Sequence, residues 1–293
     1  MATPVPVSSP VRSLSRPNLI AELRAFLAVA RRELLIFIRY PTWVFAVLVW
    51  PLIFPAVYIL TGRALAGPDG SGLAVFERLA GTSDFMGFIV IGTTIWMWQN
   101  IVLWEVGSAL RQEQMRGTLE TNWLSPTWRF SYLLASGASQ FLTMLLFMIV
   151  AAFEFSLLLG VHFQAHLGVV LLVVLMSFPS IYGLAFAFAS LVISAKEVSA
   201  FVYLVRGLVM VFCGITFPIA LLPDWMQIVA RWLPQSYIIH AMRAATLSGA
   251  TLQALLPDLS ALTGFGAFWL VTGYLMFKLM ERRAQRNGTI GQY

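Results

Sequence analysis

The stretch LGVVLLVVLMSFPSIYGLAFAFASLVIS, residues Leu167–Ser194, contains no charged side chain. A helix needs ~20 mostly apolar residues to cross the hydrocarbon core of a bilayer. The stretch does not alternate apolar and polar residues with period two, as a strand of a membrane barrel would. It therefore predicts a membrane-spanning helix, in which Pro179 is tolerated because neighbouring helices can satisfy the freed carbonyl.

Similar runs recur along the rest of the chain. Of its 293 residues, 59% are hydrophobic and only 11% are charged, which is too few charges to coat a soluble surface. The single cysteine, Cys213, excludes an intrachain disulfide. We predict an all-α integral membrane protein with six transmembrane helices. The other five lie at Trp43–Thr61, Phe85–Val106, Tyr132–Gly160, Ala200–Leu221 and Leu259–Met280.

The two ends of the chain differ from this transmembrane domain, which we place at residues 19–280. Residues 1–18 are rich in Ser, Pro and Arg and lack a signal-peptide core, so we expect a disordered cytoplasmic tail. Within 19–40, apolar residues recur at helical spacing beside four arginines, which predicts an amphipathic helix in the membrane interface. The alternative is that this helix simply extends the first span. Residues 281–293 form a basic cytoplasmic tail.

Basic residues set the expected orientation. With the N-terminus in the cytoplasm, most Lys and Arg residues fall on the cytoplasmic side, as the positive-inside rule requires. The outer side holds only Arg63, Arg78, Arg231 and Arg243. Both termini are then cytoplasmic, and we expect a multi-pass protein of the cell (plasma or inner) membrane.

One outer segment, residues 222–258, is too apolar for a free loop and too interrupted for a span. It predicts two short helices within Trp225–Leu247 that re-enter the outer leaflet and need protein to cover their ends. The residues that mark them are Trp225, Trp232, Pro234 and Tyr237.

Signs of catalysis are missing from the sequence. The only lysines, Lys196 and Lys278, do not follow a glycine, so the usual nucleotide-binding loop is absent. His162 and His166 have a spacing that zinc could use, but we favour an exposed interfacial pair because further ligands are lacking. His240 is interpreted as a satisfied interface histidine. We expect no catalytic residue, cofactor or metal in this chain.

Polar and charged residues within spans are costly and therefore suggest function. Glu105 ends the second predicted span, so its carboxylate is expected to reach the cytoplasmic interface. Glu154 and Arg206 differ too much in depth to pair directly; each either makes a structural contact or lines a substrate path. We expect a path between two subunits along the second and fifth spans, although the amides could instead bond a neighbouring helix. The pathway candidates are Trp96, Gln99, Asn100, Glu154, Tyr203 and Arg206.

Two segments resemble the ABC type-2 transporter permeases, the membrane subunits of ATP-binding-cassette exporters. The cytoplasmic segment EQMRGTLETNWLSPTWRF, Glu113–Phe130, is similar to the coupling region of that family, with its Gly-Thr-Leu-Glu core at residues 117–120 and Ser-Pro at 125–126. The outer segment Gly214–Arg243 matches in its Phe-Pro, Leu-Pro-x-Trp and Leu-Pro pairs and final arginine. The resemblance covers the chain from about Leu19 to its C-terminus.

The resemblance implies a transport mechanism with separate subunits. Two permeases, identical or different, form the pathway, and a pair of ABC ATPase subunits binds ATP and Mg below them. A short coupling helix passes the ATPase motion to the spans. The implied ATPase-coupling residues are Glu113, Arg116, Gly117, Thr118, Leu119 and Glu120.

Residues 39–43, Arg-Tyr-Pro-Thr-Trp, are nearer to the drug- and lipid-type exporters than to the polysaccharide exporters. The implied function is outward movement of a hydrophobic or amphiphilic substrate such as a drug, lipid or glycolipid. The partners are the ATPase pair, a second permease and the bilayer, with no nucleic acid. The alternatives are a polysaccharide-type exporter permease, an intramembrane enzyme, and a non-transporting membrane scaffold or receptor.

Overall fold

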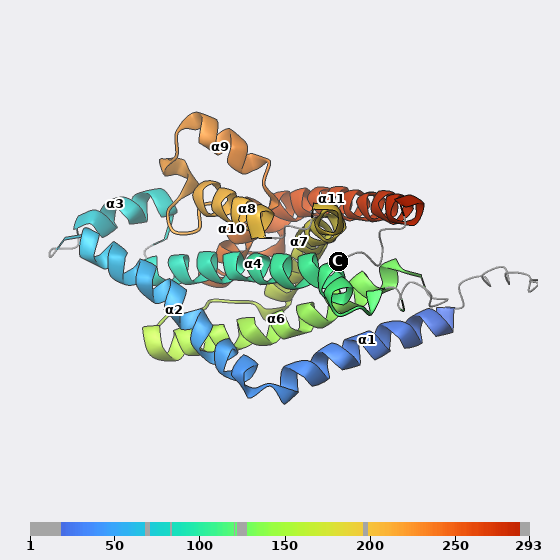
Figure 1. Cartoon of the computed structure of the whole chain (residues 1–293). Helices are drawn as coiled ribbons and strands as arrows, with labels where there is room; N and C mark the ends of the chain where they lie inside the picture. Colours follow the sequence, from blue (N-terminus) through green and yellow to red (C-terminus); the bar gives the residue numbers. More distant parts are fainter. Residues whose placement is uncertain are drawn as a thin grey trace, which may run out of the picture.

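A computed structural model describes residues 19–67, 71–82, 84–119, 121, 128–195 and 199–287, and all regular structure in these ranges is helical (Figure 1). The elements in chain order are α1 (Leu19–Arg39), α2 (Pro41–Leu65), α3 (Ser71–Ala80), α4 (Phe85–Met115), α6 (Phe130–Leu159), α7 (Leu167–Ala195), α8 (Ser199–Phe212), the 3₁₀ turn η1 (Ile219–Leu221), α9 (Asp224–Arg231), α10 (Pro234–Leu247) and α11 (Leu252–Asn287).

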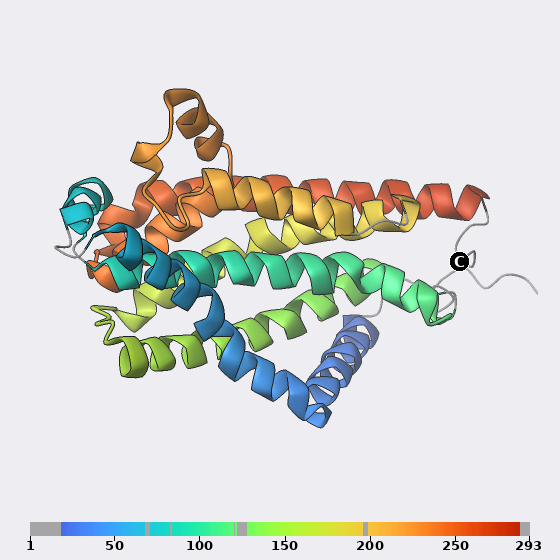
Figure 2. The same ribbon diagram turned by 60° about the vertical axis from the view of Figure 1, so that its left-hand side comes forward.

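Helix α4 is the centre of the bundle. It packs against α2, α6, α7, α8 and α10, and both views show it between α6 and α11 (Figures 1 and 2). Trp98, Val102 and Leu110 have no exposed surface. A helix that carries polar side chains among its apolar residues needs neighbouring elements to cover them in a membrane. The core of the subunit is therefore built around α4.

Helices α7 and α11 come closest to one another at paired glycines. A Cβ on Gly183 would lie 2.6 Å from the backbone nitrogen of Leu270, and one on Gly273 would lie 2.7 Å from the carbonyl oxygen of Gly183. Small residues let helix backbones approach closely where lipid provides no hydrophobic drive for association. Gly183 and Gly273 thus fix the tight α7–α11 contact.

Five helices of the described residues are long and apolar enough to cross a membrane, and they correspond to five of the six predicted spans. They lie in α2, α4, α6, α7 and α11. Most run further than predicted: α4 continues past Val106 to Met115, and α11 starts at Leu252 and extends to Asn287. Residues 281–287, predicted as the start of a tail, are therefore helical.

The predicted fifth span, Ala200–Leu221, is not one continuous helix. Helix α8 has 14 residues, or ~21 Å of rise, which is shorter than the ~30 Å hydrocarbon core. The chain then turns at Gly214, whose φ of 66° lies in the left-handed region that glycine adopts without strain. Pro218 follows, which cannot donate a backbone hydrogen bond. Only the first part of the predicted fifth span is thus helical, and the described residues do not confirm the predicted count of six spans.

The N-terminal helix separates from the first span, as predicted. Pro41 begins α2 after Tyr40, which is extended with ψ of 96°, and proline is favoured at the first position of a helix. Figure 2 shows α1 at a steep angle to α4 and α11. Leu23, Leu27 and Ile38 of α1 are exposed. That α1 lies in the membrane interface remains a prediction.

Two short helices, α9 and α10, fill most of Trp225–Leu247 as predicted, with the break at Trp232 and Leu233 before Pro234. Helix α9 stands out from the bundle (Figures 1 and 2). Trp225 and Trp232 are exposed, whereas the hydroxyl of Tyr237 donates to the carbonyl of Arg231 at 3.1 Å. Re-entry of these helices into the outer leaflet remains a prediction.

Candidate functional site

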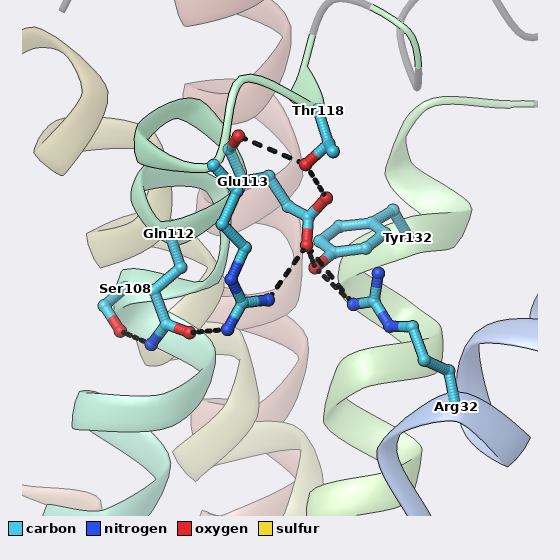
Figure 3. Close-up of polar contacts among 7 residues, drawn as sticks. Arg32, Ser108, Gln112, Glu113, Thr118 and Tyr132 are labelled. Atoms are coloured by element: carbon cyan, nitrogen blue, oxygen red, sulfur yellow. Dashed lines mark hydrogen bonds and ion pairs between the residues drawn. The ribbon is translucent and has the colours of Figure 1, made fainter. Parts of the chain in front are cut away.

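Glu113, near the C-terminal end of α4, is the centre of a polar cluster that joins three parts of the chain (Figure 3). Its Oε1 accepts hydrogen bonds from the Tyr132 hydroxyl of α6 at 3.0 Å and from Arg32 Nη2 of α1 at 3.3 Å. Its Oε2 accepts from the Thr118 hydroxyl at 2.7 Å. Arg116 Nη1 lies 3.5 Å from Oε1. We call these five residues the Glu113 cluster.

The backbone at the end of α4 explains why the coupling segment begins with glycine. The amide of Gly117 donates to the carbonyl of Gln114 and that of Thr118 to the carbonyl of Glu113, both at 3.0 Å. With Gly117 at φ 71°, this pair of bonds is a Schellman motif, which ends a helix at a left-handed residue. The Thr118 side chain is thereby turned back onto Glu113.

Burial separates the predicted coupling residues into two groups. Glu113 is 2% exposed and Leu119 3%, so neither presents a surface to a partner. Arg116, with 55% of its side chain exposed, remains accessible. Glu120, Ser125 and Pro126 lie outside the described residues. Glu113 was predicted as one of the ATPase-coupling residues, and the structure shows its buried carboxylate bonded to Thr118 of the segment that follows α4.

A second site gathers three of the pathway candidates on the face of α4 toward α2 and α8. The guanidinium carbon of Arg206 lies 4.6 Å from the ring centroid of Trp96 and 5.9 Å from that of Phe54. The Trp96 indole donates to the Arg206 carbonyl at 3.4 Å, and Tyr203 packs on Trp104 at 5.8 Å between centroids. Aromatic faces stabilise a guanidinium at such distances. We call Phe54, Trp96, Tyr203 and Arg206 the α8 seam.

The other pathway candidates lie elsewhere. Gln99 and Asn100 are 5% and 9% exposed within α4, and Val102 beside them is fully buried. A helix enclosed in its own subunit cannot face a second subunit along its length, so α4 contributes to a path only where α2 and α8 leave it open. Glu154 is on α6, where its Oε2 is buried and has no hydrogen-bond partner among the described residues. No ion pair joins it to Arg206 in the described part of the chain.

Arg243 of α10 has a role that the sequence did not reveal. Its guanidinium donates four hydrogen bonds of 2.7–3.2 Å to the carbonyl oxygens of Phe88, Gly214 and Ile215, and stacks on the Phe88 ring. The last two carbonyls belong to the irregular segment after α8. A Cβ on Gly92 would lie 2.4 Å from Arg243 Nη2 and 2.2 Å from the Ile215 oxygen. The sequence placed Arg243 among the outer charges and as the final arginine of the outer motif, and the structure shows that it joins α4, α10 and the segment after α8.

His240 has the partner that a satisfied interface histidine needs. Its Nδ1 lies 2.8 Å from Asp258 Oδ2 of α11. This hydrogen bond raises the pKa of His240 above its ordinary value. The pair links α10 to α11.

A bundle of long apolar helices, with a polar cluster at one helix end and an arginine lying on aromatic rings beside a spanning helix, is the arrangement of an integral membrane protein that keeps polar groups inside it. The family model described as "ABC-2 family transporter protein" matches residues 43–275. The chain belongs to this family and is an ABC-2 type permease, a membrane subunit whose family implies an ABC ATPase partner. Comparison with curated proteins gives no match.

Proposed function

We propose that this permease is the membrane subunit of an exporter that moves a hydrophobic or amphiphilic substrate outward across the cell membrane. A separate pair of ABC ATPase subunits binds Mg and ATP and supplies the energy. Both termini face the cytoplasm. The observation that carries the proposal is the α8 seam. A guanidinium lying on aromatic rings within a membrane bundle is costly against lipid hydrocarbon, but it can contact the polar and apolar parts of an amphiphile.

The Glu113 cluster supports the coupling part of the proposal. It fixes the segment after α4 to α1 through Arg32 and to α6 through Tyr132. A displacement of the exposed Arg116, or of the residues that follow it, would therefore be transmitted to α1, α4 and α6 together. Coupling between sites requires such a contiguous connection, which a free loop would not provide.

The exposed side of α8 supports a pair of permeases. Tyr203 and Leu204 are each 58% exposed, and a Cβ on Gly207 would meet no atom within 4 Å. One subunit offers only part of a channel wall, so we place the path between two subunits along α8. Small residues favour close approach of helices in a membrane.

A cysteine at Gly207 is expected to crosslink the two permeases. In a Cys213→Ala background, Gly207→Cys should give a disulfide-linked pair under mild oxidation, visible as a doubled mass on a non-reducing gel. If the second permease is a different chain, the disulfide requires a cysteine placed at the facing position of that chain as well. Val202→Cys is the matched control, because Val202 is on the same helix but fully buried. Equal crosslinking of both variants, or of neither, contradicts the proposed interface.

Replacing Arg206 by glutamine is expected to reduce ATP-driven export about tenfold, since one charge-assisted contact to substrate is lost. The permease is reconstituted in liposomes with the ATPase that co-purifies with it, and export of a panel of fluorescent amphiphiles is followed with and without vanadate. Arg231→Gln, on exposed α9, is the control and should leave export unchanged. If the wild-type complex shows vanadate-sensitive ATPase activity but moves no amphiphile, the proposed substrate class is wrong. If it shows no ATPase activity at all, the chain is a scaffold and not a transporter.

A further inference from the structure

Helix α1 carries exposed apolar side chains along much of its length. Leu23, Leu27 and Ile38 each keep more than half of their surface exposed, although the helix packs against α6 and α2. Single exposed apolar residues are ordinary on a protein surface, but several on one helix mark a surface that binds another partner. The rest of the subunit does not cover this side of α1.

Two arginines share that side with the leucines. At 100° per residue, Leu23, Leu27, Arg31 and Arg24 fall within an arc of about 100° around the helix axis. Both arginines are exposed, and neither forms an ion pair within the described part of the chain. The next residue, Arg32, reaches inward to Glu113 (Figure 3). We call Leu23, Arg24, Leu27 and Arg31 the α1 outer face.

The charge of α1 indicates a negatively charged partner. The helix contains four arginines and two glutamates, which gives it a net charge of +2. Arg39, in its last turn, is exposed as well. A partner that fits the α1 outer face must therefore combine negative charge with an apolar surface for the leucines.

An anionic membrane surface has both of these properties. Acyl chains can cover the leucines, while the long arginine side chains extend to the phosphates of the head groups. Helix α1 is ~31 Å long and lies at a steep angle to α4 and α11, as a helix along the membrane surface would (Figure 2). It leads through Tyr40 directly into α2, which contains the first span, so its end lies at the membrane boundary.

We propose that the α1 outer face docks on phospholipids whose head groups carry a net negative charge. Arg24 and Arg31 contact the head groups, and Leu23 and Leu27 lie among the acyl chains. Each basic residue near an anionic membrane surface strengthens such binding about fivefold. The proposal goes beyond the proposed function, because docking on lipid needs neither the ATPase nor a substrate. It adds a lipid class to the interfacial position predicted for α1.

Fluorescence quenching by brominated lipids measures which lipid lies beside α1. A bimane label is attached to Ala28→Cys in a Cys213→Ala background, because Ala28 is exposed on α1 next to the outer face. The whole permease is placed in vesicles of phosphatidylcholine and phosphatidylglycerol in equal amounts, with one or the other lipid brominated. We expect the label to show a preference of at least about fivefold for the anionic phosphatidylglycerol.

Variants of the two arginines test the cause of this preference. Arg24→Gln with Arg31→Gln should reduce it to less than about twofold, since both contacts to the head groups lose their charge. Lysine at both positions keeps the charge and should keep the preference. Arg63→Gln with Arg231→Gln is the matched control, because it removes two exposed arginines outside α1 and should have no effect.

Salt provides a test that needs no variant. At about 1 M salt the Debye length is ~3 Å, so attraction between exposed charges is largely screened. The preference of the wild-type face for phosphatidylglycerol should therefore fall to less than about twofold. This measurement decides the proposal even if the double glutamine variant fails to fold.

Equal quenching by both brominated lipids at low salt overturns the proposal, as does a preference that persists in the double glutamine variant or at high salt. A label that neither lipid quenches, and that is shielded from iodide only when the ATPase is added, shows instead that the face meets the ATPase. The exporter function is judged separately by ATP-driven transport. Absence of transport with the lipid preference intact rejects that function and leaves the docking of α1.

Discussion

Replacing Glu113 by alanine is expected to lower the free energy of unfolding by about 2–3 kcal/mol and to uncouple ATP hydrolysis from transport. Breaking a buried ion pair costs ~3–5 kcal/mol when one charge is left uncompensated. We expect the loss of stability in Glu113→Ala to be at or below the lower end of this range, because Arg32 and Arg116 are partly exposed and water can solvate them. Tyr132 and Thr118 also lose their acceptor.

The effect on transport follows from what the cluster connects. Without Glu113, the segment after α4 keeps its Schellman turn but loses its side-chain links to α1 and α6. We expect ATP-driven export to fall about tenfold, within the 0.5–2 kcal/mol by which such connections change coupling, while ATPase activity continues. Export and ATP hydrolysis are measured on the same proteoliposomes, and stability by the thermal unfolding midpoint.

Two comparison variants identify the cause. Glu77→Ala removes an exposed carboxylate of α3 and should leave stability and coupling unchanged. Glu113→Gln keeps the shape and the acceptor for Tyr132 but loses the charge, and should lie between wild type and Glu113→Ala. If Glu113→Ala exports as well as wild type at equal stability, the cluster does not transmit the ATPase motion.

Most of the helices could be predicted from the sequence because a membrane span has a simple local signature. An apolar run of sufficient length must satisfy its backbone internally, and only a helix does so in lipid. Pro41, and Pro234 after Leu233, marked two further breaks correctly. The early end of the α8 helix at Phe212 was not predicted, because the segment after it is held by Arg243, which is 29 residues from Gly214 along the chain. A hydropathy window of span length is too short to include both residues of that contact.

The candidate site was predicted less well, for a related physical reason. The alternating charges around Glu113 indicated a polar segment but not which side chain faces inward. That choice is made by Arg32 and Tyr132, which come from other helices. Likewise, the amides of the second span suggested a lining helix, but the neighbouring helices bury both amide side chains of α4. A polar residue in a span indicates that it needs a polar partner, but the local sequence does not show which residue that partner is.

Arg243 makes the strongest case for a contact that no local pattern predicts. After Phe212 the chain leaves the helix, so carbonyls that a helix would use have no backbone partner. In a membrane protein, each such group needs another donor. The guanidinium supplies donors to Gly214 and Ile215 while its remaining bonds reach Phe88 at the start of α4. The Arg243 side chain thus satisfies the carbonyls that are left free where the fifth span breaks, and it also attaches that segment to α4.

Arg243→Ala is expected to destabilise the permease by about 3 kcal/mol and to loosen residues 213–218. Hydrogen bonds from a charged donor stabilise a protein by ~1.5–3 kcal/mol each. The variant loses these bonds but no longer has to bury a charged group, which offsets part of the lost stability. Arg243→Lys should be intermediate, since a lysine keeps the charge but cannot reach three carbonyls with a planar fork. Thermal unfolding midpoints measure the first effect, and hydrogen exchange of the 213–218 amides measures the second.

Arg231→Ala provides the matched comparison, because Arg231 is an exposed arginine on α9, close to Arg243 in the chain. It should unfold within about 1 °C of wild type, as surface substitutions change stability by no more than ~0.5 kcal/mol. Gly92→Ala offers an independent route to the same contact, since its new methyl group would push on both Arg243 and the Ile215 carbonyl. It should raise exchange at 213–218 as Arg243→Ala does. Exchange that stays at the wild-type level in both variants would show that another contact holds the broken span in place.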